Sequence, residues 1–174
     1  MRMKEVPEMH NKVKDIAFFG MCISLALALA YVEMLMPPLF ASVPGIKMGL
    51  PNIILIFLLY RRGLVPAITV SLLRMVLVTL LFGNTMAFFY SLAGGVLSMA
   101  VMALLKRLNF LSTTGVSVAG AVTHNVGQIL VAMWLLNTAE LGYYLIVLAI
   151  TGTIAGLFIG LCGSLLIRRI PTKW

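Results

Sequence analysis

The chain has 174 residues, of which 61% are hydrophobic and only 10% are charged. Soluble domains are typically about 45–50% apolar and about 25% charged, so this composition excludes an ordinary water-soluble protein. The formal net charge is +8, yet the basic residues lie at the ends of apolar segments, as in the cytoplasmic loops of membrane proteins. We therefore expect a single-domain membrane protein, in contact with lipid, that binds no nucleic acid.

Six apolar segments follow one another along the chain. A membrane-spanning helix needs about 20 mostly apolar residues, and Pro, Gly and Asn residues separate the segments. The pattern predicts helices over residues 16–36, 48–60, 64–83, 85–105, 115–136 and 141–167. The predicted fold is an all-α integral membrane protein, with a cytoplasmic N-terminal tail (1–15) and a six-helix transmembrane domain (16–170).

The basic residues predict the orientation of these helices. They precede the first helix or follow the second, fourth and sixth helices: Arg2, Lys4, Lys12, Lys14, Arg61, Arg62, Lys106, Arg107, Arg168, Arg169 and Lys173. Cytoplasmic loops of membrane proteins collect Lys and Arg. If both termini are cytoplasmic, all of the 13 basic residues except Lys47 and Arg74 fall on that side or in the tails attached to it. We therefore predict an N-in, C-in topology in the cell membrane.

The second helix is too short to cross a bilayer. At about 1.5 Å per residue it covers about 20 Å, whereas the hydrocarbon core is about 30 Å thick. Its outer end is therefore expected to begin below the surface, with residues 37–49 dipping into the protein as a re-entrant loop. Pro51 suits the first turn of a helix. Free backbone N–H groups near Asn52 are then expected to face inward and to favour an anion.

Polar residues within the apolar helices are candidate functional residues. Arg74 lies near the middle of the third helix, where a charge is costly. It either binds an anionic group of a substrate or forms a structural contact with helix-end carbonyls or with Glu33. His124, Asn125 and Gln128 lie at a similar depth on the fifth helix. They either line a substrate pocket or form hydrogen bonds between helices, and ligation of a metal by His124 is the less favoured interpretation.

Further polar residues fall near the outer ends of their helices. Glu33, Lys47, Asn52 and Asn84 lie there, and together with Tyr90 they are candidates for the polar wall of an outward-facing site. The alternative is a rim of solvated side chains. Lys47 stands out because it is the one basic residue expected on the outer surface, next to the short second helix.

Two stripes of small residues predict close helix packing. On the sixth helix the stripe is Gly152, Gly156, Gly160 and Ser164, for which we favour packing inside the protein. On the first helix it is Gly20, Ser24 and Ala28, flanked by Ala26 and Ala30. For the first helix, internal packing and docking of a partner subunit remain equally open.

Signals for an enzyme are absent from the sequence. There is no P-loop, so the chain is not expected to hydrolyse ATP itself. It has only five acidic residues, and three of them, Glu5, Glu8 and Asp15, lie at or before the start of the first helix. Chemistry on diphosphates normally recruits Mg²⁺ through clustered carboxylates. We therefore expect no catalytic residues, no metal and no cofactor.

Five motifs in order resemble those of the Gx transporter family, which is also labelled heptaprenyl diphosphate synthase component I. The first, Lys47–Ile53, follows a K-x-G-L-x-N-I pattern with Pro51 as a mild departure, and Thr123 is another departure in the last motif. The motifs are Lys47–Ile53, Leu73–Arg74, Leu81–Asn84, Tyr90–Gly95 and Gly120–Gln128. The resemblance covers nearly the whole chain after the N-terminal tail.

This family is similar to the S components of energy-coupling factor (ECF) transporters. The resemblance implies six helices, a solute site near the outer surface capped by the loop between the first two helices, and a coupling subunit driven by two ATPases. It also implies that Gly20, Ser24, Ala26, Ala28 and Ala30 form the docking face for that coupling subunit.

Two functions follow from these patterns. The first is an S-component-like subunit that captures a small anionic, isoprenoid-, quinone- or vitamin-related solute from outside for import. In that case Arg74 and Lys47 would hold negative charge, and the amides and His124 would supply hydrogen bonds. The second is a membrane accessory subunit of heptaprenyl diphosphate synthase, for which the family label is the argument.

Overall fold

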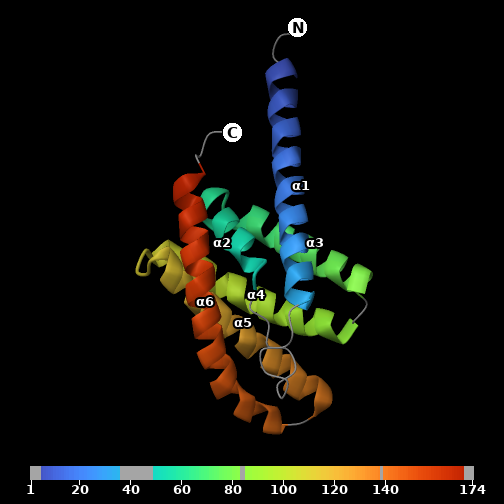
Figure 1. Cartoon of the computed structure of the whole chain (residues 1–174), viewed down its shortest axis with the longest axis vertical. Coiled ribbons are helices and arrows are strands. Elements are labelled where there is room, and N and C mark those ends of the chain that lie inside the picture. Colours follow the sequence, from blue (N-terminus) through green and yellow to red (C-terminus); the bar gives the residue numbers. More distant parts are fainter. Residues whose placement is uncertain (1–4, 36–48, 83–84, 138, 171–174) are drawn as a thin grey trace.

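The computed structural model describes residues 5–35, 49–82, 85–137 and 139–170. All the secondary structure in these ranges is helical (Figure 1). The elements are α1 (Glu5–Leu35), α2 (Asn52–Arg61), α3 (Leu64–Phe82), α4 (Thr85–Leu108), α5 (Thr113–Leu136), a short 3-10 helix η1 (Ala139–Tyr143) and α6 (Tyr144–Arg169). The predicted all-α fold is confirmed, and six α-helices lie at the predicted places in the described chain.

Five of these helices, α1, α3, α4, α5 and α6, are long and apolar enough to cross a membrane. Large apolar side chains cover their outer surfaces, which indicates lipid rather than water as the surrounding medium. The chain is therefore a multi-pass membrane protein. The first helix begins at Glu5, so part of the predicted N-terminal tail is helical and continuous with α1.

The second helix, α2, is short and lies at the centre of the bundle. Its 10 residues extend for about 15 Å, half the thickness of a hydrocarbon core. Six consecutive residues, Ile54–Leu59, are buried, which is the burial expected for a helix that is apolar on every side. These side chains form the main core together with residues of α1, α3, α4 and α5, and α2 packs most closely against α3 and α6.

Basic side chains tie together several helix ends at one end of the bundle. Arg61, at the end of α2, donates hydrogen bonds to two carbonyl oxygens at the C-terminal end of α6. The neighbouring Arg62 forms an ion pair of 3.1 Å with Asp15 on α1. Lys106 of α4 donates a hydrogen bond of 2.5 Å to the carbonyl oxygen of Leu59. The basic helix ends therefore satisfy carbonyl groups as well as carrying charge.

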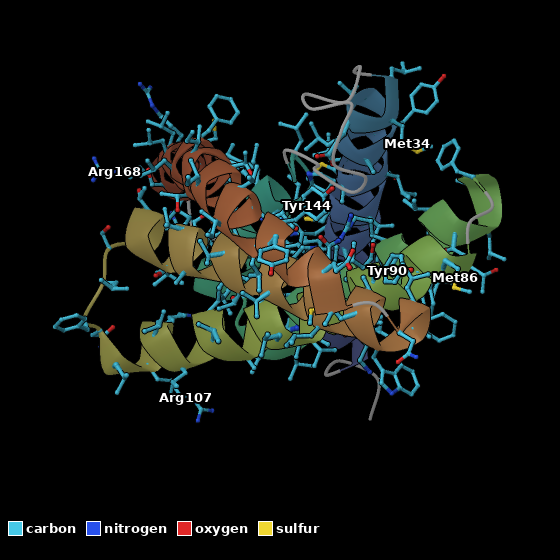
Figure 2. The ribbon with its side chains drawn as sticks, turned by 90° about the horizontal axis from the view of Figure 1, so that it is seen from below. Met34, Met86, Tyr90, Arg107, Tyr144 and Arg168 are labelled. Atoms are coloured by element: carbon cyan, nitrogen blue, oxygen red, sulfur yellow. The ribbon has the colours of Figure 1, made fainter. Side chains whose placement is uncertain are left out.

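The figures show the positions of the helix ends from two perpendicular directions. The beginning of α1 and the end of α6 lie at the same upper end of the molecule (Figure 1). In Figure 2, Arg107 and Arg168 lie on one side, whereas Met34 and Met86 lie on the other. The hydrogen bonds and the ion pair described above thus join the basic ends of α2, α4 and α6 and the start of α1, while the predicted orientation in the membrane stays a prediction. We call this end of the bundle the basic end below.

The glycine stripe of α6 packs inside the protein, as predicted. A Cβ atom added at Gly156 would lie 2.7 Å from the Cα atom of Val118, and one at Gly160 would lie 2.7 Å from the Cα atom of Thr114. Both of these neighbours are on α5, so the two backbones touch where any larger side chain would separate them. Gly163 extends this contact to α2, where it lies against Ile56.

The small residues of α1 fall on two different faces. Ala26 and Ala30 are buried in the bundle, with exposed fractions of 0% and 5%. Gly20, Ser24 and Ala28 are exposed, and nothing lies within 4 Å of a Cβ atom added at Gly20. Ala26 and Ala30 therefore do not share the exposed face of the other three residues, because Ala26 packs in the core around α2 and Ala30 is buried at the cavity described below. Docking on this helix stays a prediction.

Candidate functional site

A cavity of about 320 Å³ lies between the helices, on the side of α2 away from the basic end. It is reached by residues from the last turns of α1, the start of α2 and the middle of α3, together with residues of α4, α5 and α6. The cavity contains six of the nine predicted binding residues: Glu33, Asn52, Arg74, His124, Asn125 and Gln128. Residues that lie far apart in the sequence are therefore brought to one polar site.

Arg74 on α3 places a positive charge in this cavity. Its Nε atom is buried and has no hydrogen-bond partner among the described residues. A buried donor without a partner is costly, and the cost is larger for a charged group. The guanidinium group interacts electrostatically with Glu33, which lines the same cavity. Arg74 therefore has an electrostatic partner but retains an unused donor.

Glu33 organises the backbone that precedes α2. Its carboxylate accepts a hydrogen bond from the backbone N–H of Gly49. Gly49 has a positive φ of 73°, a conformation that favours glycine, and its carbonyl oxygen accepts a hydrogen bond of 2.8 Å from the N–H of Asn52. This turn directs the side chain of Asn52 into the cavity.

The prediction of free N–H groups at the start of α2 is wrong. The N–H groups of Asn52, Ile53 and Ile54 donate hydrogen bonds to the carbonyl oxygens of residues 49, 50 and 51. Pro51 has helical backbone angles, so a tight turn with i→i+3 hydrogen bonds precedes the helix and uses these donors. Asn52 thus contributes its side chain to the cavity, whereas its backbone N–H is already bonded.

The three polar residues of α5 contribute in different ways. Asn125 donates a hydrogen bond of 2.7 Å from Nδ2 to the carbonyl oxygen of Leu148 on α6, so it joins two helices as well as lining the cavity. His124 and Gln128 lie against α4 at Gly94, where an added Cβ atom would be 2.6 Å from the carbonyl oxygen of His124. The hydrogen bond of Asn125 agrees with the predicted contact between helices, whereas the binding of a substrate by this patch stays a prediction.

The remaining predicted residues have other positions. Lys47 and Asn84 lie outside the described residues, as does almost all of the predicted re-entrant loop. Tyr90 is half-buried on α4 but does not line the cavity. Its neighbour Ser91 lines it instead, because successive residues on a helix point about 100° apart.

Sequence reasoning missed several residues that complete the site. Thr79 and Ser91 add hydroxyl groups, and Phe82 and Phe88 add aromatic rings. Ser91 lies three positions before Gly94, so the face that packs on α5 was a signal that could have found it. No comparable signal marks the aromatic rings, because Phe is also common on lipid-facing surfaces.

The combined chemistry suits an anionic group beside an apolar one. The cavity offers a guanidinium group, amide and imidazole groups and hydroxyl groups, with aromatic rings on the same wall. Such a mixture of apolar walls and a few placed polar groups is typical of sites for small molecules. Among the residues that the structure describes, no group of three His, Cys, Asp or Glu side chains is arranged to hold a metal ion.

Comparisons with known proteins bear on this chain at the level of its family. No curated protein and no solved structure matches the sequence. A family model described as heptaprenyl diphosphate synthase component I matches residues 22–166, a range that includes every residue lining the cavity. Because that match extends over most of the 174 residues, the chain belongs to the heptaprenyl diphosphate synthase component I family.

Proposed function

We propose that this protein is a solute-binding membrane subunit that captures a small anionic or amphipathic molecule in the cavity for import. The observation that carries the proposal is the buried Nε atom of Arg74, a charged donor with no hydrogen-bond partner in the described chain. A charged residue inside a membrane helix is costly and is a functional candidate by default. An anionic ligand would supply the missing partner.

The size and lining of the cavity support this proposal. At about 320 Å³ it falls within the range of about 300–1,000 Å³ found for small-molecule sites. His124, Asn52 and Gln128 reach it from two different helices and would supply directional hydrogen bonds. Glu33 would either accept a hydrogen bond from the ligand or keep the turn at Gly49 in place.

The orientation that we propose follows from the positions of charge. The basic end collects Arg61, Arg62 and Lys106 together with the last turn of α6. Such residues favour the cytoplasmic side of a bilayer. With the basic end inside the cell, we propose six crossings with both termini in the cytoplasm, of which the second ends with the short helix α2. The cavity then opens toward the outside of the cell membrane.

Import would require a partner, because the sequence has no P-loop for ATP hydrolysis. We place the docking face for an ECF-type coupling subunit on the exposed small residues of α1, Gly20, Ser24 and Ala28. Small side chains let a second helix approach closely in a membrane. In this proposal the chain itself catalyses no reaction and needs no cofactor, and the energy comes from ATPases attached to the coupling subunit.

The proposal can be tested with purified protein in lipid nanodiscs. Small anionic molecules, beginning with alkyl phosphates and carboxylates, are titrated into wild-type protein and into the Arg74→Gln variant. We expect a ligand that binds the wild type to lose roughly tenfold or more in affinity on Arg74→Gln. The control is Arg62→Gln, which changes the same charge at the basic end. Equal affinity for wild type and Arg74→Gln would refute the assigned site.

A second function is favoured by the family match. The family is described as a component of heptaprenyl diphosphate synthase, so the chain is a candidate membrane accessory subunit of a polyprenyl diphosphate synthase. Affinity purification from the native host separates the two functions. Recovery of ATPase and coupling subunits supports solute import, whereas recovery of a prenyltransferase supports the accessory role.

A further inference from the structure

A second, almost wholly apolar groove of about 300 Å³ lies between α3 and α4. Its walls are mainly Leu, Ile, Val and Met side chains, and two of them, Leu72 and Val96, are largely exposed on the outer surface of the bundle. These two helices contact each other less extensively than α4 and α5 do. The groove therefore opens between two membrane-crossing helices, toward lipid.

This groove adjoins the polar cavity. Met75 lines both spaces, and a void of about 10 Å³ between them is lined by Arg74, Gly95 and His124 among others. A Cβ atom added at Gly95 would lie 2.4 Å from the Cε atom of Met75, so the methionine side chain occupies the space that this glycine leaves free. The flexible side chain of Met75 is thus one of the groups that lie between the groove and the charged group.

The two spaces are also arranged with a definite polarity. The groove follows α3 from Met75 back to Leu64, a distance of about 16 Å at about 1.5 Å per residue, and so runs from the middle of the bundle toward the basic end. The polar cavity lies on the other side of Arg74. A ligand with its charged head at Arg74 and its apolar chain in the groove would therefore point its chain from the middle of the bundle toward the basic end.

We propose that the ligand of this protein is an amphiphile, with an anionic head at Arg74 and a hydrocarbon chain in the groove between α3 and α4. This inference rests on the proposed function of the polar cavity and names the class of its ligand. Met75 is the gate that turns aside when the chain enters. The unpartnered Nε atom of Arg74 requires a hydrogen-bond acceptor, and the positive charge of the guanidinium group favours an anionic one, either a phosphate or a carboxylate.

The test uses full-length protein in phosphatidylcholine nanodiscs, with empty nanodiscs as the baseline for partitioning. The probes are ethyl, hexyl and decyl phosphate, with decanoate and decyltrimethylammonium as head-group controls. We expect affinity to rise with chain length, and the ammonium probe not to bind. Whether decyl phosphate or decanoate binds more tightly then identifies the preferred head group, and either result supports the proposal.

The decisive variant fills the groove. Val96→Trp is compared with Leu104→Trp, since both residues are on α4 and both are exposed, at 61% and 57%, but only Val96 lines the groove. We expect Val96→Trp to lower the affinity for decyl phosphate roughly tenfold and to leave the affinity for ethyl phosphate unchanged. Leu104→Trp should leave the affinities for both phosphates unchanged. Equal effects of the two variants, or affinity independent of chain length, overturn the proposal.

The same experiment separates this inference from the proposed function. Suppose that binding of ethyl phosphate depends on Arg74 but affinity does not depend on chain length. The proposed role of the cavity then stands, and the inference that its ligand is an amphiphile is refuted. If Arg74→Gln leaves every phosphate probe unchanged, both fail. A decyl phosphate carrying a photoreactive group at the chain end gives a readout that needs no variant. Labelling of α3 or α4 supports the groove, and labelling of α6 refutes it.

Discussion

The side chain of Asn125 on α5 donates a 2.7 Å hydrogen bond to the backbone carbonyl oxygen of Leu148 on α6. The contact is possible because Gly152 lies beside it, where an added Cβ atom would be only 2.7 Å from Nδ2 of Asn125. Asn125 thus belongs to the cavity wall and to the α5–α6 interface at once.

This relationship predicts that Asn125 and Gln128 differ in their effect on stability. Asn125→Ala removes a hydrogen bond between helices, and we expect it to lower the free energy of unfolding by about 0.6–1.5 kcal/mol. Gln128→Ala changes the same cavity wall, and we expect it to lower the free energy of unfolding by less than Asn125→Ala does. Thermal unfolding in the same detergent measures both. Equal unfolding temperatures for Asn125→Ala and wild type would contradict the structural role.

A second prediction concerns two glycines with opposite surroundings. Gly156→Val places a side chain against the backbone of α5, where a Cβ atom is already 2.7 Å from Val118, and we expect a loss of about 1–3 kcal/mol. Gly20→Val meets nothing within 4 Å and should leave the stability of the isolated protein nearly unchanged. Under the proposed docking mode, Gly20→Val nevertheless reduces recovery of the coupling subunit. Normal recovery would place the docking face elsewhere.

A third prediction compares the adjacent arginines at the basic end. Arg62 pairs with Asp15 at 3.1 Å, but both side chains are partly exposed, so a double-mutant cycle should give a coupling of about 0.2–1 kcal/mol that falls with added salt. Arg61 holds carbonyl groups at the end of α6 and is half-buried. We therefore expect Arg61→Gln to destabilise the protein more than Arg62→Gln. The reverse order in denaturation experiments would show that the α6 contact contributes little.

A fourth prediction tests the orientation in the membrane. In a background in which Cys22 and Cys162 are replaced by Ala, single cysteines are introduced as Arg107→Cys, Arg168→Cys and Tyr143→Cys. A membrane-impermeant thiol reagent added to intact cells should label only Tyr143→Cys, which lies in η1 and is exposed. Labelling of Arg107 and Arg168 positions on opposite sides of the membrane would invalidate the topology.

Much of the fold was predictable because hydrophobic length and charge position are properties of the sequence itself. The short α2, the basic ends and the internal α6 stripe were anticipated for this reason. The split of the α1 stripe was not, since Ala26 and Gly20 look alike until it is known which side of the helix faces α2. A small residue allows close packing of helices, but its size does not indicate which helix packs against it.

The candidate site was predictable in part. Polar residues within apolar helices are rare enough to stand out, and Arg74, His124 and Gln128 do share one cavity. Ser91 lines the cavity whereas the predicted Tyr90 does not, because one position along a helix changes the face. The N–H groups at Asn52 were wrongly expected to be free, because the turn that uses them depends on the positive φ of Gly49.

The enclosure of α2 has a consequence for how far a solute must travel. A short helix in contact with lipid would draw the bilayer thin around it. Here the five other helices are long enough to set the thickness, and the polar cavity begins at Asn52, where α2 begins. Under the proposed function, a solute bound beside Arg74 would already lie part of the way across the bilayer, inside a cavity that protein rather than lipid surrounds.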